Sequence, residues 1–301
     1  MTALPDSAER AGELLARQGY VAGGRLSTAV FLALSLKRPL FLEGEAGVGK
    51  TELARALAAA LGRRLIRLQC HEGLDLAGAA YEWNHARQIL AIRLAEGGGR
   101  ERVKDLSGSL YSREFLIERP LLEALAPSGQ RPPVLLVDEL DRADEPFEAY
   151  LLEFLADFRM SIPELCEIEA EQPPIVVLTS NRTREVHDAL KRRCLYCWVD
   201  YPARAAEERI LAARVPGLPE ALRAKVAGFV QALRKEGLFK APGVSETLDW
   251  AEALMAIGAG DAEDIDAESV SQTLGALLKY QEDLGAVDDS MVERLLAASY
   301  L

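Results

Sequence analysis

Two kinds of hydrophobic pattern alternate along the first two thirds of the chain. Short apolar runs are typical of buried parallel strands, and longer segments with an apolar residue every third or fourth position are typical of core-facing helices. The expected strands cover residues 39–43, 65–70, 134–137 and 175–178, and the expected helices cover residues 25–37, 53–61, 88–95, 120–125 and 144–158. We interpret residues 71–130 as an insertion between core strands. The alternation predicts an α/β fold with a parallel sheet.

The pattern changes near Pro202. No convincing strand follows, and apolar residues such as Leu222 and Val226 recur at helical spacing instead. We therefore expect two domains: an αβα domain at residues 1–203 and a small all-helical lid domain at residues 204–301.

The loop between the first expected strand and its helix reads GEAGVGKT, and its residue types fit the P-loop pattern G-x-x-x-x-G-K-[ST]. Its glycines allow consecutive N–H groups to point at a polyphosphate. Lys50 would supply a positive charge for the β- and γ-phosphates, and the Thr51 hydroxyl would be an oxygen ligand for Mg²⁺. An ordinary glycine-rich turn is the alternative. The predicted cofactors are ATP and Mg²⁺, and the predicted nucleotide contacts in this segment are Gly44, Glu45, Ala46, Gly47, Val48, Gly49, Lys50, Thr51 and Glu52.

The apolar run at residues 134–137 ends in two carboxylates, Asp138 and Glu139, which resembles a Walker B motif. At the carboxyl end of a strand, Asp138 would join Thr51 in holding the Mg²⁺ shell and would belong to the cofactor-binding set. Glu139 would polarise the attacking water as a general base. A strand followed by an acidic turn is common, but its place downstream of a P-loop favours the catalytic interpretation.

The next strand, at residues 175–178, leads into Thr179, Ser180 and Asn181. We predict that Asn181 lies between the γ-phosphate and the water, as a sensor 1 residue does. The alternative is an asparagine that caps the following helix.

A short basic segment follows, with Arg192 and Arg193 just before Cys194. These cations could simply complement the negative end of a helix dipole. The functional alternative is an arginine finger that enters the nucleotide site of a neighbouring subunit, with Arg193 as first choice and Arg192 as second.

The formal charge of −12 is concentrated near the C-terminal end. Residues 246–301 carry thirteen acidic side chains and only two basic ones. No long basic stripe is present, which argues against nucleic acid as a partner. Four of the acidic residues, Asp261, Glu263, Asp264 and Asp266, could form a docking surface for a basic partner or simply a solvated face.

Other features point to a cytoplasmic protein without a membrane span. No apolar stretch approaches the ~20 residues that cross a bilayer, and residues 1–17 lack an apolar signal core. Four cysteines fit a reducing compartment. Cys194 and Cys197 form a CxxC motif inside an apolar run, but the sequence has no second CxxC pair to complete a zinc site. The three histidines are scattered without metal-ligand spacing, and we expect them to be structural: His71, His85 and His187.

These motifs, in this order, resemble the AAA+ ATPases. The sequences of residues 138–153, 161–165 and 178–202 resemble those of the MoxR branch. Within that branch they resemble the CoxD-type accessory ATPases of molybdenum hydroxylase (CO dehydrogenase) maturation. The resemblance extends over nearly the whole chain. It implies a homo-oligomeric ring, expected to be hexameric, that remodels a client metalloenzyme in a chaperone-like way. It also implies a von Willebrand A domain protein as partner.

One segment departs from the family pattern. The family's lid usually carries a sensor 2 arginine, but the matching stretch, residues 243–247, reads GVSET and has none. Two other functions stay open at this point. One is a clamp-loader-like ATPase that acts on DNA, and the other is a nucleotide switch that binds without hydrolysis.

Overall fold

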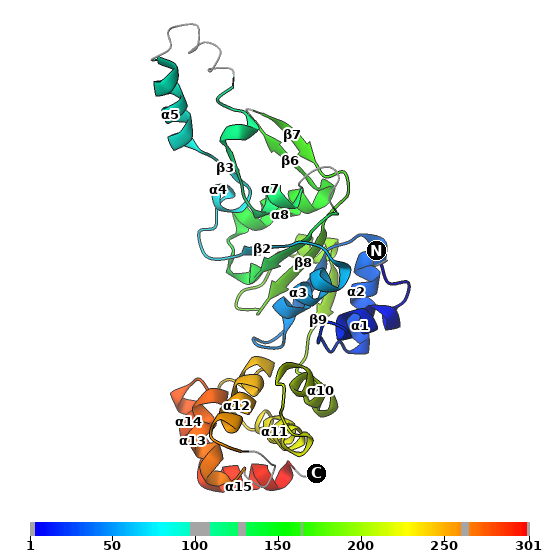
Figure 1. Cartoon of the computed structure of the whole chain (residues 1–301), viewed down its shortest axis with the longest axis vertical. Helices are drawn as coiled ribbons and strands as arrows, with labels where there is room; N and C mark the ends of the chain where they lie inside the picture. The colour runs from blue at the N-terminus through cyan, green and yellow to red at the C-terminus, as the bar shows by residue number, and fades with distance from the viewer. Residues whose placement is uncertain (1–3, 97–108, 126–130, 164, 260–264, 300–301) are drawn as a thin grey trace. The chain divides into compact units, whose positions relative to one another are not determined.

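The computed structural model describes residues 4–96, 109–125, 131–163, 165–259 and 265–299 (Figure 1). The strands are β1 Leu40–Glu43, β2 Leu65–Gln69, β3 Tyr81–Trp83, β4 Leu116–Glu118, β5 Val134–Asp138, β6 Arg159–Ile162, β7 Cys166–Glu169, β8 Ile175–Ser180 and β9 Leu195–Trp198. The helices before residue 200 are α1 Ala8–Ala16, α2 Gly24–Leu36, α3 Lys50–Leu61, α4 Leu76–Ala79, α5 His85–Glu96, α7 Pro120–Ala124, α8 Glu145–Asp157 and α9 Asp188–Arg193, with 3₁₀ turns η1 Arg113–Phe115 and η2 Leu140–Arg142. The later helices are α10 Arg204–Arg214, α11 Glu220–Leu233, α12 Val244–Ala256, α13 Ala267–Leu277, α14 Gln281–Ala286 and α15 Asp289–Ala298.

Five strands form the main sheet in the order β2-β5-β8-β1-β9. Strand β5 pairs in parallel with β2 on one side and with β8 on the other. All five residues of β5 are buried, as the short continuous apolar run predicts. The predicted α/β class with a parallel sheet and helices is therefore confirmed.

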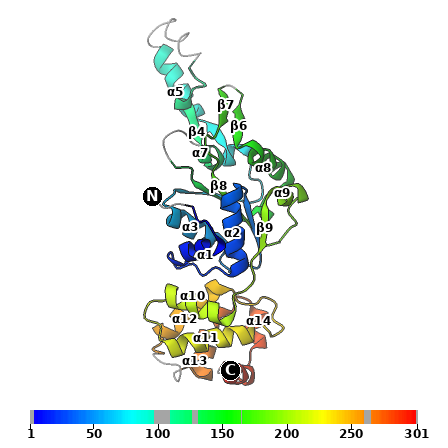
Figure 2. The same cartoon turned by 90° about the vertical axis from the view of Figure 1, so that its right-hand side faces the viewer.

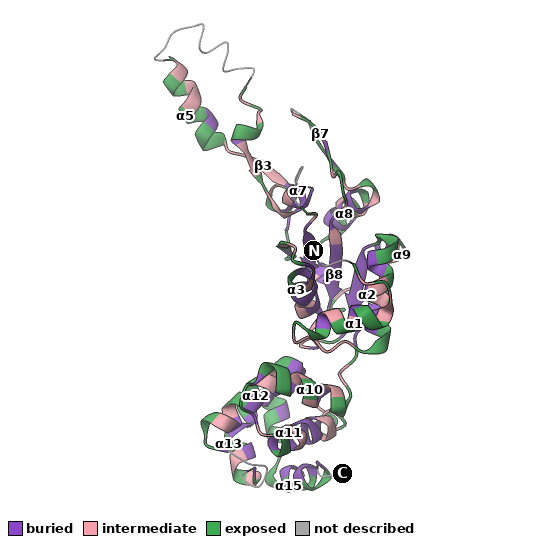
Figure 3. Cartoon of the chain, turned by 45° about the vertical axis from the view of Figure 1, so that its right-hand side comes forward, coloured by how far each residue is buried: buried purple, intermediate pink, exposed green. Residues whose placement is uncertain are grey.

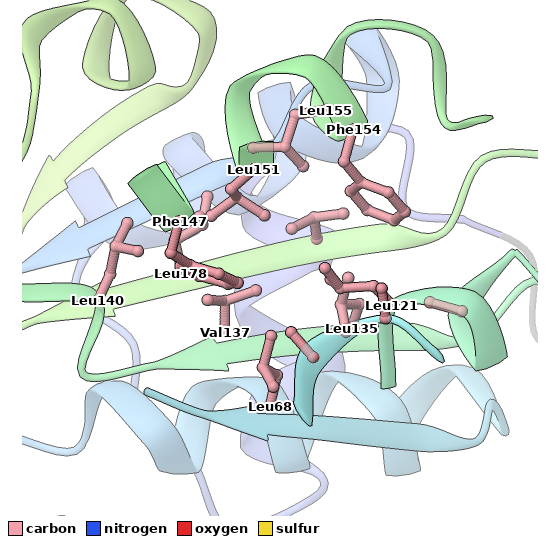
Figure 4. Close-up of a cluster of buried hydrophobic side chains, with 14 of the residues drawn as sticks. Leu68, Leu121, Leu135, Val137, Leu140, Phe147, Leu151, Phe154, Leu155 and Leu178 are labelled. Carbon is pink, nitrogen blue, oxygen red and sulfur yellow. The ribbon is translucent and has the colours of Figure 1, made fainter. Parts of the chain in front are cut away.

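Helix α8 covers the described core beside β5 and β8 (Figure 4). Asp144 caps it by accepting a hydrogen bond from the Phe147 backbone N–H, and a proline lies in its first turn, as expected. In Figure 4, Phe147 and Leu151 point toward Leu178 and Val137 on the sheet. Successive contacts along the helix are four positions apart, which is why the sequence pattern revealed this face.

Two antiparallel strand pairs were missed by the sequence analysis. Strands β3 and β4 pair within the expected insertion, and β6 and β7 run side by side after α8 (Figure 2). Each strand has only three or four residues, which is too short for period-two alternation to stand out. The helices expected in the insertion are present as α5 and α7, and Figure 3 shows α5 mostly exposed or half-buried.

The described residues after β9 are helical, as predicted. They have a core of their own, in which the Phe229 and Trp250 rings lie 5.0 Å apart between centroids. Helix α11 is largely buried in Figure 3. A buried ion pair joins Arg234 to Glu207 with both guanidinium nitrogens engaged, so neither charge is left uncompensated in this core.

The chain forms two compact units, and each unit is built from segments that are not contiguous in the sequence. Residues 32–42 and 57–196 make up most of the first unit, and residues 5–31, 43–56 and 197–301 make up the second. The P-loop sequence thus belongs to the second unit, and the carboxylates after β5 belong to the first. The domain boundary at residue 203 stays a prediction.

Candidate functional site

The P-loop sequence forms the turn between β1 and α3. Gly47 and Gly49 have φ of 77° and 91°, in the left-handed region that favours glycine. The Lys50 ammonium is buried and donates to the backbone oxygens of Gly44, at 2.7 Å, and Glu45, at 2.6 Å. The loop therefore has the positive-φ glycines that a phosphate cradle of backbone N–H groups requires, and it carries a lysine.

Gly44 is required by a close approach of the backbone. A Cβ atom at this position would lie 2.3 Å from the Val199 carbonyl oxygen, a contact that no side chain could avoid. Val199 in turn donates its N–H to the Glu43 oxygen at 2.8 Å. The start of the loop is thus packed directly against the chain that follows β9.

The N-terminus of α12 contacts the same loop. Val244 N–H donates to the Gly47 oxygen at 2.9 Å, and a Cβ on Gly47 would lie 2.9 Å from a Glu246 carboxylate oxygen. This is the stretch in which the family pattern would have a sensor 2 arginine. Here a carboxylate approaches the loop, and that carboxylate accepts a hydrogen bond from the Gly243 N–H at 3.0 Å.

A cavity of about 400 Å³ opens beside the loop within the second unit. Its walls include Val48, Ile210 and Leu248, with Tyr20 nearby, whose pKa is raised mainly by burial. At its edge, Arg214 pairs with Glu52 at 2.6 Å. An apolar cavity with a few polar groups, beside a loop with the P-loop sequence, is suited to a planar ring. No motif marked Tyr20, Ile210 or Arg214, so the sequence analysis missed them.

In the first unit, Asp138 at the end of β5 is held from both neighbouring strands. It is 2% exposed. Its Oδ2 accepts from Arg67 of β2, with Nε at 3.0 Å and Nη2 at 2.5 Å, and its Oδ1 accepts from the Thr179 hydroxyl of β8 at 2.6 Å. Arg67 therefore supplies the positive charge that a buried carboxylate needs.

Glu139 follows at a sharp turn of the backbone. Its φ of 55° and ψ of 49° are left-handed, which is uncommon for a residue with a side chain. Its Oε2 accepts from Gln69 Nε2 at 2.8 Å and pairs with Arg142 Nε at 3.2 Å. Its backbone N–H donates to the Thr179 hydroxyl at 2.9 Å.

Asn181 is tied to the same turn through Asp141. The Asp141 carboxylate accepts from the Asn181 N–H at 3.1 Å, from the Thr183 N–H at 2.9 Å and from the Thr183 hydroxyl at 2.6 Å. Burial acts to raise the pKa of Asp141, but the hydrogen bonds from Thr183 and Asn181 outweigh it and leave the pKa below its ordinary value. The structure thus brings Asp138, Glu139 and Asn181 together at one edge of the sheet.

Arg192 and Arg193 end α9, and both are exposed. Arg38 donates to their backbone oxygens, at 2.9 Å to Arg192 and 3.2 Å to Arg193, and so stabilises the helix end. Lys37 joins these three arginines around a cavity of about 470 Å³. Four cationic side chains at one hollow favour an anionic partner.

The histidines have local roles in the structure. His187 caps α9 by accepting from the Ala189 N–H at 3.2 Å, and His85 contacts Gln88. His71 contacts the neighbouring backbone oxygen. Within the described ranges no group of three or more histidine, cysteine or acidic side chains could hold a metal ion.

Comparison with known proteins places these residues in a family. Residues 39–194, more than half of the chain, match the AAA domain of the dynein-related subfamily. The gas vesicle ATPase GvpN of Ancylobacter aquaticus is 29% identical over 216 residues, which are 66% of this chain and 55% of the relative. The peroxisomal Lon protease homolog 2 of Pichia angusta is 30% identical over 190 residues, which are 58% of this chain and 17% of the relative. The chain thus spans about half of the first relative and a small part of the second.

Among solved structures, the chain is similar to the RuvB Holliday junction branch migration motor of Thermotoga maritima. The TM-score is 0.46 at 16% identity, and the match covers 96% of this chain and 74% of the other.

Proposed function

This chain belongs to the AAA ATPase family, in its dynein-related subfamily, and we propose that it binds ATP with Mg²⁺ and couples hydrolysis to the remodelling of a client protein. The observation that carries the proposal is the pair of carboxylates after β5, of which Asp138 is buried and Glu139 is half-buried. A hydrogen bond joins the turn that follows them to Asn181. A site that only bound nucleotide would not need a general base beside a water-orienting amide.

We assign phosphate binding to the P-loop, residues 44–51. Its left-handed glycines turn backbone N–H groups inward, and Lys50 supplies the charge for the β- and γ-phosphates. Bound Mg²⁺ would neutralise charge on the phosphates, and Thr51 and Asp138 would hold it. Magnesium sites of this kind use one or two protein oxygens besides phosphate and water, which fits the absence of a larger acidic or histidine cluster among the described residues.

We assign water activation to Glu139 and water orientation to Asn181. Glu139 is partly exposed and would take a proton from the attacking water at its carboxylate. Asn181 would orient that water. Gln69 and Arg142 both contact the same Glu139 oxygen and so restrict where the carboxylate points.

The oligomeric part of the proposal rests on α9. Arg193, with Arg192 as the second choice, would reach the nucleotide of a neighbouring subunit as an arginine finger in a homo-oligomeric, hexameric ring. Both side chains are exposed at a helix end that Arg38 stabilises, which supports this role.

The finer assignment is a MoxR-type, chaperone-like ATPase that assists maturation or metal-cofactor insertion of a client enzyme in the cytoplasm, with a von Willebrand A domain protein as partner. It is supported by the amino-acid sequence of residues 138–153 and 178–202. The GvpN relative is named as a gas vesicle ATPase, and copurification of this chain from its native host would identify its own client. In the described part of the chain, no helix has the length and apolar character needed to span a membrane.

Lys50→Ala tests the proposal directly. Losing a desolvated charge partner costs ~2–5 kcal/mol, so ATP affinity should fall at least about 30-fold and phosphate release should cease. Lys235→Ala, which removes an exposed lysine far along the sequence, is the matched control and should behave as wild type. The measurements are equilibrium binding of a fluorescent ATP analogue and phosphate release.

Two results would redirect the proposal. Tight ATP binding by the wild-type protein without any phosphate release would favour the nucleotide switch. A mobility shift of labelled DNA at physiological salt, with stimulation of phosphate release by that DNA, would favour the DNA-acting alternative. The net charge of −12 argues against the second result.

A further inference from the structure

The Thr179 hydroxyl contacts both acidic residues that follow β5. Thr179 lies on β8 and is 1% exposed. Its Oγ1 lies 2.9 Å from the Glu139 backbone nitrogen and 2.6 Å from Asp138 Oδ1. A backbone N–H can only donate, so the hydroxyl accepts from Glu139 and gives its single proton to Asp138. Both hydrogen-bond directions are therefore determined.

The hydroxyl joins both acidic residues to β8, on the other side of β5 from β2. Strand β5 lies between β2 and β8. From β2, Arg67 binds Asp138 and Gln69 binds Glu139. From β8, Thr179 is the residue that reaches both.

The hydroxyl also supports an unusual backbone conformation. The left-handed φ and ψ of Glu139 are unfavourable for a residue other than glycine, and such conformations persist only where the surroundings hold them. The Glu139 N–H that points at Thr179 is part of that turn. Two residues beyond Thr179, the backbone reaches Asn181, which Asp141 ties to the same turn.

We propose that Thr179 is a positioning residue for ATP hydrolysis: its hydroxyl sets the direction of the Asp138 carboxylate and the turn that aims Glu139. The inference rests on the proposed ATPase function of the same site. It assigns no contact between Thr179 and the nucleotide or the reacting atoms, so its effect on turnover should exceed its effect on nucleotide binding.

Thr179→Val removes the hydroxyl and keeps the shape of the side chain. The Glu139 N–H and Asp138 Oδ1 then lose their shared partner. A misplacement of ~1 Å can cost 10²-fold in rate, so kcat should fall about 10- to 100-fold. The KM for ATP should stay within about threefold of wild type, because the predicted phosphate contacts are elsewhere in the chain.

Thr179→Ser is the conservative variant. It retains the hydroxyl and loses only a methyl group, so kcat should return to within about threefold of wild type. If Thr179→Val does not fold, Thr179→Ala provides the same test, with the same expected loss relative to Thr179→Ser.

Thr273→Val is the matched control for the loss of a buried hydroxyl. Thr273 Oγ1 also accepts one hydrogen bond, from Trp250 Nε1 at 2.9 Å, and donates one, to the Ser269 oxygen at 2.7 Å. It lies in the C-terminal helical core. This variant should lower the melting temperature as Thr179→Val does, with an unchanged kcat.

A double variant separates positioning from general structural damage. In a Glu139→Gln background the base is absent, so Thr179→Val should cause a smaller further loss of phosphate release than it causes in wild type. A full additional loss in that background would overturn the proposal. So would a wild-type kcat in folded Thr179→Val, or equal losses in the serine and valine variants. If wild-type protein released no phosphate at all, the ATPase function would fail, which is distinct from these outcomes.

Discussion

A left-handed backbone at Glu139 turns the chain directly after β5. Side chains from both neighbouring strands form hydrogen bonds with Asp138 and Glu139 at this turn. Asp138 lies inside this group, with Arg67 on one oxygen and Thr179 on the other. A buried carboxylate without such partners would be strongly destabilising. At the scale of single residues, the candidate site is therefore an interlocked set of hydrogen bonds in which the predicted catalytic groups depend on neighbours with no catalytic role.

Asp141 gives a prediction about pH at this scale. Its pKa lies below the ordinary value, so its contribution to stability is fully present above the unfolded pKa of about 3.9 and is lost as the pH falls toward the folded pKa. Asp141→Asn places an amide nitrogen against a backbone N–H donor. It should lower the free energy of unfolding by about 1–3 kcal/mol at pH 7.

Urea denaturation of wild type and Asp141→Asn at pH 7, 5 and 3.5 measures this. The difference between the two proteins should be the same at pH 7 and 5 and smaller at pH 3.5. A difference that stays constant over the whole range would contradict the assignment of the lowered pKa to the folded state.

At the scale of elements, how far the sequence could predict the structure depended on the range of the interactions. The strands at residues 134–137 and 175–178 and the helix at residues 144–158 were predictable, because burial imposes a local pattern on each. The antiparallel strand pairs β3–β4 and β6–β7 were not, because strands of three or four residues are too short for a pattern.

The same distinction applies to the candidate site. Asp138 and Glu139 could be proposed because they directly follow an apolar run. Arg67, Gln69 and Thr179 could not, because they reach the carboxylates across the sheet from strands distant in sequence. The contacts of Arg67 and Gln69 depend on the register Gln69↔Asp138, and those of Thr179 depend on the register Val137↔Leu178. No local motif encodes either register.

At the scale of the whole molecule, the proposal requires more than one copy of the chain. An arginine finger acts on the nucleotide of a neighbour, so its loss can be repaired by mixing subunits. The docking hypothesis for the acidic residues also belongs to this scale. Asp261, Glu263 and Asp264 lie outside the described residues, whereas Asp266 caps α13 through the Ser269 N–H.

Mixing two inactive variants tests the finger. Arg193→Ala should bind ATP yet lose ~10³–10⁵ in turnover, the usual value of a finger supplied by another subunit. In mixed assemblies with Lys50→Ala, some interfaces pair an intact P-loop with an intact arginine, so phosphate release should partly recover. Lys191→Ala, on the same helix end, is the control and should retain turnover. No recovery at any ratio, in assemblies shown to be mixed, would mean that Arg193 acts within its own subunit or only structurally.

The most direct test of the central claim is the rate of phosphate release by Glu139→Gln alongside its affinity for ATP with Mg²⁺. The substitution keeps the size of the side chain and removes the base. Because general base catalysis contributes ~10²–10⁴-fold, turnover should fall by that factor, while the dissociation constant for ATP stays within about threefold of wild type. Hydrolysis at the wild-type rate by Glu139→Gln would contradict the account, since the carboxylate after β5 would then have no part in the reaction.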